Sequence, residues 1–168
     1  MSGIAANAEP AIEVLDLVKD YKKLRAVDGI RFSVARGTNC ALLGGNGAGK
    51  TTTLSMLLGL LLPTSGQIRI LGIDMVKHRY AALPRMNFTS PYVDLPHRLT
   101  VGQNLDVYAR LYGLRHRKRR LGEVADIFDL GALWKRLYGS LSAGQKTRVS
   151  LAKALLNEPE IQIGRAHV

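Results

Sequence analysis

A glycine-rich segment in the first third of the chain carries the clearest chemistry in the sequence. It matches the P-loop pattern without a mismatch, in the order Gly44, Gly45, Asn46, Gly47, Ala48, Gly49, Lys50 and Thr51. Glycines let the backbone turn tightly and approach a phosphate, so that consecutive N–H groups can form a nest for an anion. Lys50 can reach the β- and γ-phosphates of a nucleotide, the Thr51 hydroxyl can ligate Mg²⁺, and Thr52 can add a hydrogen bond. The segment therefore predicts a site for a magnesium nucleotide.

The residues on either side of this loop predict the strand and the helix that it needs. Residues 40–43 form a short apolar run, typical of a strand buried on both faces, and residues 50–62 are rich in helix formers. This context argues against the alternative, a glycine-rich turn with a chance lysine. Further strands are expected at 11–18, 27–34, 67–71 and 85–88, and further helices at 78–83, 100–112, 121–128 and 144–156. Strands that alternate with helices around such a turn indicate an α/β architecture.

Length and composition exclude several classes of protein. A chain of 168 residues, 46% hydrophobic and 22% charged, fits one ordinary globular domain rather than a disordered or fibrous protein. Its single cysteine, Cys40, cannot form an intrachain disulfide, which fits a reducing compartment. The most apolar stretch, 54–62, is too short to span a bilayer, and residues 1–10 do not resemble a signal peptide.

The charge of the chain is strongly positive, and part of the excess is local. The net charge of +11 favours anionic partners such as nucleotides, nucleic acid or an acidic membrane surface. One cluster contains Arg115, His116, Arg117, Lys118, Arg119 and Arg120. We interpret it as a solvated loop or helix start. Nucleic-acid binding is the alternative, but the cluster lacks an aromatic platform and a known motif, so no specific nucleic-acid partner is expected.

A second motif precedes the helix expected at 144–156. It reads Leu141, Ser142, Ala143, Gly144 and Gln145. Ser142 and the backbone of Gly144 would lie at a helix N-terminus, which favours anions. Ser142 and Gln145 also fit a capping box, which is the alternative for this motif taken alone. Together with the P-loop, the motif resembles the signature (commonly LSGGQ) of the ATP-binding subunit of an ABC transporter, with Ala143 in place of the commoner glycine.

The resemblance implies a fold and a set of site residues. The fold would be α/β, a P-loop NTPase of the ABC type, with an N-terminal antiparallel β subdomain, a RecA-like core and a helical signature subdomain over about residues 100–141. Tyr21 stands where the family places its adenine-stacking aromatic residue; the alternative is a strand-end tyrosine that packs on the surface. In the family, residues 141–145 complete the ATP site of a second subunit, so that a head-to-tail dimer holds two ATP molecules with Mg²⁺.

The resemblance also implies partners and a location. A second ATP-binding subunit, identical or not, would complete the dimer. A transmembrane permease subunit would dock near Tyr92 to Tyr112, with the protein in the cytoplasm at the inner face of the membrane. Hydrolysis of ATP would then drive transport. The sequence most resembles the ATP-binding subunits of exporters of drugs, polysaccharides or lipids. A non-transport ABC ATPase that acts on ribosomes or DNA, or a nucleotide-binding remnant without hydrolysis, is the alternative.

The residues after the strand expected at 85–88 depart from the family. The family usually carries a glutamine there that touches Mg²⁺ and the attacking water and relays the nucleotide state to the permease. Here residues 89–92 (Thr-Ser-Pro-Tyr) stand in its place. Ser90 can ligate Mg²⁺, but Pro91 has no donor. Because Gln103 belongs to a helix, the glutamine role is assigned to no residue.

The C-terminal residues depart further. In the family an apolar strand after Glu160 ends in the Asp-Glu pair that holds Mg²⁺ and polarises water, and a later strand carries a switch histidine. No carboxylate follows Glu160 here, and none of His78, His97, His116 or His167 stands in that position. We therefore expect no catalytic residue in the chain, and we expect the strand at 40–43 to lack the neighbours that follow later in the family.

The last seven residues suggest a cause for this departure. The codons ATC GGA AGA GCA CAC GTC encode residues 163–168, and they match a widely used short-read sequencing adapter, AGATCGGAAGAGCACACGTC. A CAG codon for Gln162 would supply the first two bases of that adapter. We interpret 1–161 as part of an ABC ATP-binding domain and 162–168 as adapter sequence; a genuine C-terminus of a degenerate gene is the alternative.

Overall fold

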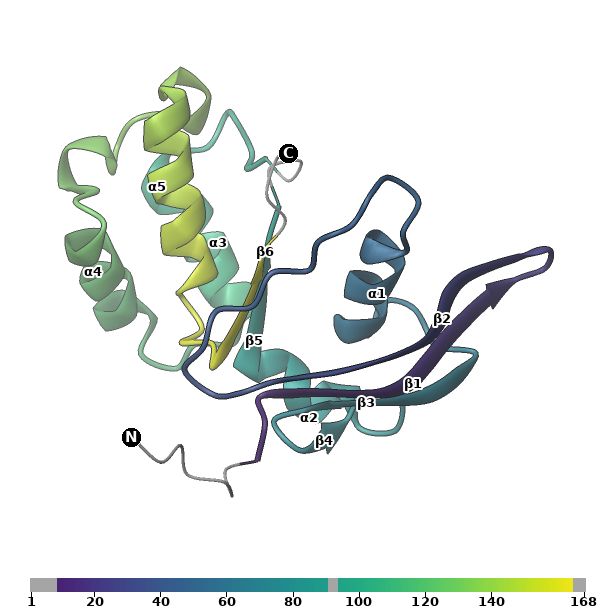
Figure 1. Ribbon diagram of the computed structural model, residues 1–168. Helices are drawn as coiled ribbons and strands as arrows, with labels where there is room; N and C mark the ends of the chain where they lie inside the picture. The colour runs from purple at the N-terminus through teal and green to yellow at the C-terminus, as the bar shows by residue number, and fades with distance from the viewer. Residues whose placement is uncertain (1–8, 91–93, 165–168) are drawn as a thin grey trace, which may run out of the picture. The chain divides into compact units, whose positions relative to one another are not determined.

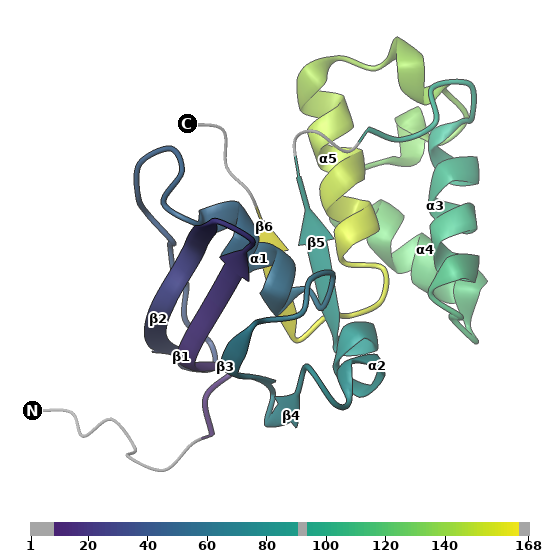
Figure 2. The same cartoon turned by 90° about the vertical axis from the view of Figure 1, so that its right-hand side faces the viewer.

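The protein is described by a computed structural model that covers residues 9–90 and 94–164. The chain divides into two units, Met1–Leu83 and Pro84–Val168, which we call the N-terminal and the C-terminal unit. Figure 1 and Figure 2 show the elements of each from two sides.

The N-terminal unit is built on an antiparallel sheet of four strands in the order β2-β1-β3-β4. Its elements are β1 (Ile12–Tyr21), β2 (Leu24–Val34), α1 (Lys50–Leu57), β3 (Ser65–Ile70), β4 (Ile73–Asp74) and α2 (Arg79–Ala82). Ile68 and Ile70 alternate along β3 and are fully buried, as expected for one covered face of a sheet. Met56 and Leu57 of α1 are buried as well, and α1 contacts β2 and β3 (Figure 2).

The C-terminal unit combines a parallel pair of strands with a group of helices. Its elements are β5 (Met86–Thr89), α3 (Val101–Leu111), α4 (Arg117–Ile127), α5 (Ala143–Ala154) and β6 (Ile161–Gly164), with 3₁₀ turns at Leu83–Arg85, Gly131–Leu133 and Tyr138–Ser140. Parallel strands need a crossover connection, and the helices between β5 and β6 supply it (Figure 1). Val101, Leu105 and Ala109 of α3 recur at helical spacing and are fully buried in the core of this unit.

Two side-chain contacts hold the starts of β5 and β6 together. The Arg85 guanidinium donates to both oxygens of the Glu160 carboxylate, at 2.5 and 2.9 Å. The Asn157 amide donates to the carbonyl oxygens of Pro84 and Met86, at 3.0 Å each, and accepts from Asn87 at 2.7 Å. Asn87 is buried, so its bond to Asn157 satisfies a buried polar group, whereas the Arg85–Glu160 pair joins the two strand starts at the surface.

Most of the predicted elements are confirmed, within a few residues at their ends. The strand predicted at 40–43 is wrong: within the described part of the chain, residues 38–45 form neither helix nor strand. Leu43 is 84% exposed. A strand needs a hydrogen-bonded neighbour, and none of the described strands pairs with this segment. The helix predicted at 50–62 ends at Leu57, where Gly59 turns the chain with a φ of 67°.

The burial pattern of α3 gives a test of the core. We expect Leu105→Ala to lower the free energy of unfolding by about 2–5 kcal/mol, because the side chain is fully buried and its loss leaves a cavity. Leu111→Ala, on the same helix but 72% exposed, should cost less than about 1 kcal/mol. Urea unfolding of the protein encoded by the complete gene, followed by Trp134 fluorescence, measures both. Equal losses would show that α3 does not bury this face.

Candidate nucleotide-binding site

The end of the P-loop packs closely against β2, and the glycine at position 49 makes this close approach possible. Gly49 has a φ of 79° and precedes the first turn of α1. A Cβ atom at this position would lie 2.3 Å from the carbonyl oxygen of Ala26 on β2. Gly47 also has a positive φ, 85°, but a Cβ atom there would meet open space. Of these two glycines, Gly49 is therefore the one required both for its backbone angle and for its close approach to β2.

Lys50 folds back over the loop. Its Nζ donates to the carbonyl oxygens of Gly44, at 2.5 Å, and of Gly45, at 2.7 Å. The ammonium group is thereby held at the mouth of the loop by two neutral acceptors. Such acceptors bind an ammonium group less strongly than an anion does, so a phosphate group can replace them.

The start of α1 is left open for an anion. The first N–H groups of a helix have no partner within the helix, and here no side chain caps them and no acidic residue lies in the first turn. The Thr51 and Thr52 hydroxyls make no hydrogen bond to any described residue, and Thr51 is exposed. The loop, the helix end and these hydroxyls together form a surface suited to phosphate and to a cation bound with it.

Tyr21 lies on the hairpin against which the P-loop packs. It ends β1 and pairs with Leu24 of β2, two residues before the Ala26 carbonyl that contacts Gly49. Its side chain is 44% exposed, and Lys19 Nζ lies 5.2 Å from the centre of its ring. The ring is therefore partly exposed, as stacking on a base would need, although Lys19 lies over one of its faces.

The second motif forms the beginning of α5. Ser142 is its N-cap: the Ser142 Oγ accepts from the Gln145 N–H at 3.3 Å, and Gln145 Oε1 accepts from the Ser142 N–H at 3.0 Å. The capping box is thus formed. Leu141 is buried in the core of the C-terminal unit, whereas Ala143 and Gly144 are exposed. The motif therefore presents the backbone of its middle residues to solvent and anchors itself through Leu141.

A network of charged and aromatic side chains supports this motif, and sequence analysis missed it. The Asp94 carboxylate accepts hydrogen bonds from His97 Nε2, at 2.5 Å, and from the Tyr138 hydroxyl, and Lys146 Nζ lies 3.9 Å away. The hydrogen bonds from His97 and Tyr138 hold the pKa of Asp94 at about 2. Burial and the neighbouring carboxylate raise the pKa of Tyr138. The network joins the loop at Asp94 to α5, and no spacing rule brings such residues together.

The structure gives no residue the role of the glutamine that the family carries after β5. Thr89 ends β5 and its hydroxyl accepts from Gln162 Nε2 at 3.1 Å. Pro91 and Tyr92 lie outside the described residues. Gln103 is the third residue of α3 and forms a capping box with Thr100, so its amide is engaged in the helix.

Two features are absent from the described residues: a cluster of side chains that could hold a metal ion and a helix that could cross a membrane. Among the described residues no group of three His, Cys, Asp or Glu side chains is arranged to hold a metal ion. His78, His97 and His116 lie in or beside surface turns, and His167 lies outside the described residues. No helix in residues 9–90 and 94–164 has the length and apolar character needed to cross a bilayer.

A P-loop that closes on a helix N-terminus, with a second helix capped by an LSAGQ motif, defines the class of P-loop nucleotide-binding proteins with a signature motif. The family model described as ABC transporter matches residues 27–164. The chain therefore belongs to the ABC transporter family, and the interpretation drawn from the P-loop and the signature is confirmed at this level.

Individual relatives agree with this assignment. The chain is 40% identical over 152 residues to the bacitracin transport ATP-binding protein BcrA of Bacillus licheniformis, covering 90% of this chain and 49% of the relative. It is 37% identical over 155 residues to the probable multidrug ABC transporter ATP-binding protein YbhF of Escherichia coli K12, covering 91% and 27%. The chain thus spans about half or less of these relatives.

Solved structures show the same fold. An ATP-binding subunit of an ABC transporter superimposes with a TM-score of 0.78 at 31% identity, covering 92% of this chain and 65% of that one. The cbiO1 protein of Clostridium perfringens, part of the transporter complex cbiONQ, gives a TM-score of 0.80 at 27% identity, covering 94% and 65%. The expected fold, a P-loop NTPase of the ABC type, is confirmed.

The close approach of Gly49 to β2 predicts a difference between two glycines of the loop. Gly49→Ala should lower both the unfolding midpoint and the affinity for ATP, because the new Cβ would collide with the Ala26 carbonyl oxygen. Gly47→Ala should lower the free energy of unfolding by only about 1–2 kcal/mol, the cost of holding a residue other than glycine at a positive φ. Thermal unfolding and binding of a fluorescent ATP analogue to the protein encoded by the complete gene compare the two. A larger loss of stability for Gly47→Ala would contradict this account.

The Asp94 network predicts a pH-dependent contribution to stability. Because the pKa of Asp94 is lowered from 3.8 to about 2 in the folded protein, its stabilisation is present above about pH 4 and is lost as the pH falls toward 2. Asp94→Asn should therefore lower the unfolding midpoint at pH 7, and the difference from the wild type should shrink between pH 4 and 2.

The matched control for this prediction is Asp126→Asn, an exposed carboxylate on α4. It should leave the midpoint unchanged within error across the same range. A wild-type advantage over Asp94→Asn that persists undiminished at the acid end would show that the hydrogen bonds stabilise the fold without the charge.

Proposed function

We propose that the protein is the ATP-binding subunit of an ABC transporter, which binds and hydrolyses MgATP to drive transport through a membrane partner. The observation that carries the proposal is the P-loop: Lys50 lies over its carbonyl groups beside the open N-terminus of α1, in a chain of this family. This arrangement binds the phosphates of a nucleotide through backbone N–H groups and one ammonium group.

Each residue of the site has a role in this proposal. Tyr21 stacks on adenine, and residues 44–49, that is Gly44, Gly45, Asn46, Gly47, Ala48 and Gly49, cradle the phosphates. Lys50 neutralises the β- and γ-phosphate charge, and Thr52 adds a hydrogen bond. Thr51 supplies a hydroxyl ligand to Mg²⁺, which in turn offsets charge on the phosphate oxygens. The exposure of Thr51 and its uncommitted hydroxyl support this role.

A second copy or a related subunit would complete each site. In this proposal Ser142, Gly144 and Gln145 face the nucleotide of the partner subunit. Ala143 lies exposed between them, and the buried Leu141 anchors the motif. The exposed N-terminus of α5 supports it, because its backbone N–H groups suit a phosphate.

The membrane partner would dock near Tyr92 to Tyr112. Tyr92 lies outside the described residues, but α3 presents Val107, 43% exposed, and Leu111, 72% exposed, at a spacing of four residues. Two exposed apolar side chains on one helix face suit contact with another protein. The protein would then lie in the cytoplasm at the inner face of the membrane.

The direction of transport is proposed from the relatives. Their names include bacitracin transport, multidrug transport, daunorubicin resistance and Nod factor export, although one is an importer of sn-glycerol-3-phosphate at 38% identity. We therefore propose export and do not name the substrate.

Hydrolysis needs groups that this 168-residue polypeptide does not contain. No Asp or Glu follows Glu160 in its sequence, so we propose that it binds nucleotide without hydrolysing it. We propose further that 162–168 are adapter sequence.

The role of Lys50 gives the test. In the protein encoded by the complete gene, Lys50→Ala should lower ATP hydrolysis by about a hundredfold or more, because the γ-phosphate charge loses its ammonium partner. Lys135→Ala, an exposed lysine in the C-terminal unit, should leave it unchanged. Phosphate release measures both, and the 168-residue polypeptide should release none. Full hydrolysis by Lys50→Ala would refute the proposed function.

A further inference from the structure

Lys19 is a cation that the fold neither pairs with a carboxylate nor leaves to solvent. Its side chain is half-buried on β1, two residues before Tyr21. Its Nζ donates to the carbonyl oxygen of Leu62 at 2.9 Å and lies over the Tyr21 ring, 5.2 Å from the ring centre. Residues two apart on a strand share a face, which lets the ammonium group reach the ring. Among the described residues no carboxylate forms an ion pair with it.

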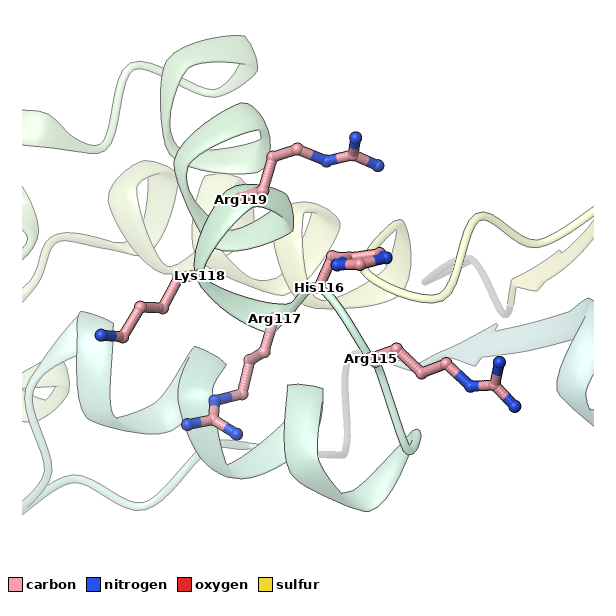
Figure 3. Close-up of a pocket in the computed structure, with 5 residues that line it drawn as sticks. All are labelled: Arg115, His116, Arg117, Lys118 and Arg119. Carbon is pink, nitrogen blue, oxygen red and sulfur yellow. The ribbon is translucent and has the colours of Figure 1, made fainter.

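The basic run at the start of α4 shows the behaviour from which Lys19 departs. Residues 115–119 line a shallow, open pocket (Figure 3). Arg117 turns toward α3, where its Nε lies 2.6 Å from the Asp106 carboxylate. Arg115 and Lys118 are exposed and point away from each other. The cations of this run are therefore paired with a carboxylate or exposed to solvent, whereas Lys19 is held by a carbonyl group and a ring.

The carbonyl group that accepts from Lys19 is itself held in place. It lies in the segment that follows α1, and two further hydrogen bonds tie that segment to the end of β1. The Thr64 N–H donates to the Val18 carbonyl oxygen at 2.9 Å, and the Asp20 N–H donates to the Thr64 hydroxyl at 2.9 Å. The ammonium group of Lys19 therefore has a defined position above the ring, unlike that of an ordinary lysine on its flexible stem.

A β-bulge connects this end of the hairpin with the P-loop. Lys19 pairs with Val27 of β2, whereas the next residue of β1 pairs with Arg25. Ala26 is therefore the extra residue of the bulge, and its carbonyl oxygen is the group that the end of the P-loop approaches. Bulges bend a strand and are frequent next to active sites, where they re-aim side chains. Lys19 thus belongs to the stretch of hairpin that contacts the P-loop.

The ring of Tyr21 has two faces, and Lys19 lies over one of them. The Tyr21 side chain nevertheless remains 44% exposed. An ammonium group is attracted to the face of an aromatic ring, and this attraction restrains the ring. A ring that is restrained before its ligand arrives loses less conformational freedom on binding, which increases the affinity. A base would then have one face to stack on, in one orientation.

We propose that Lys19 is a positioning residue for the nucleotide base: it covers one face of Tyr21, holds the ring and so directs the base to the opposite face. The proposal rests on the proposed function, in which Tyr21 stacks on adenine. Because Lys19 acts through the ring, its contribution to affinity depends on the presence of a base in the ligand and of Tyr21 in the protein.

Two ligands separate the base from the phosphates. In the protein encoded by the complete gene, Lys19→Met keeps the length of the side chain and removes its charge. Its affinity for MgATP should fall about three- to tenfold, because the ring must then be ordered on binding. Its affinity for magnesium tripolyphosphate, which has no base, should equal that of the wild type. Isothermal titration calorimetry measures both affinities.

The matched control is Lys23→Met, which removes the same charge from an exposed position in the turn between β1 and β2. It should bind both ligands as the wild type does. Lys19→Arg keeps a cation and a donor at this position, so it should bind ATP within about twofold of the wild type. In a Tyr21→Ala background, Lys19→Met should cause no further loss of affinity for ATP, because the two residues act as one unit.

Each other outcome overturns the proposal. Wild-type affinity of Lys19→Met for ATP would show that the covered face has no effect on binding. Equal weakening of ATP and tripolyphosphate would mean that Lys19 supports the P-loop or attracts phosphate by its charge. A loss in Lys19→Arg as large as in Lys19→Met would exclude the cation, and an equal loss in Lys23→Met would point to net charge. An undiminished effect in the Tyr21→Ala background would exclude the ring.

Failure of this inference can be told apart from failure of the proposed function. Binding of ATP by the wild-type protein tests the proposed function alone. If the wild type binds ATP and Lys19→Met binds it equally well, only the role of Lys19 is wrong. If the wild type binds no ATP, the proposed function is wrong and this inference with it.

Discussion

The first N–H groups of a helix have no partner within the helix, and the helices of this protein meet that constraint in different ways. α3 and α5 meet it with capping boxes, Thr100 with Gln103 and Ser142 with Gln145. α1 leaves its start uncapped, next to a loop of glycines. α4 adds four cations to a start that is already positive. α2, which is a single turn, is uncapped as well. What distinguishes α1 is that its open start lies beside the P-loop glycines, where a phosphate can bind.

The C-terminal ends of helices leave carbonyl groups without partners, and in the C-terminal unit the groups that satisfy those of α5 also connect its elements. The carbonyl groups of Leu155 and Leu156, at the end of α5, accept from Arg120, so a cation that is unfavourable in the first turn of α4 is favourable at the end of α5. Asn157, just beyond and shortly before β6, bonds to Pro84, Met86 and Asn87 at the start of β5. One short stretch of chain thereby links two helices to two strands. This explains why Arg120 is only 18% exposed although it belongs to a basic run.

The parts of the fold that sequence could predict are those set by local pattern. The P-loop spacing, the periodicity of Val101 and Leu105, and the Ser142–Gln145 spacing each depend on neighbours in sequence, and the structure has the helices they predict. The strand predicted at 40–43 was wrong because an apolar run becomes a strand only beside a partner. The local pattern predicted the strand, although the departure of the C-terminal residues from the family already implied that its neighbours would be missing. The Asp94 network was missed because Tyr138 lies more than forty residues along the chain.

The capping box at Ser142 was the competing interpretation of the signature, yet the two are compatible. A hydroxyl group has one donor and two acceptor positions, and the box uses Ser142 Oγ only as an acceptor, from the Gln145 N–H. Its proton remains free to donate to a phosphate oxygen. The box engages the N–H groups of Ser142 and Gln145, and those of Ala143 and Gly144, which have no partner within the helix, stay exposed. A capped helix start of this kind is held rigid by its own side chains and still presents three donors to an anion.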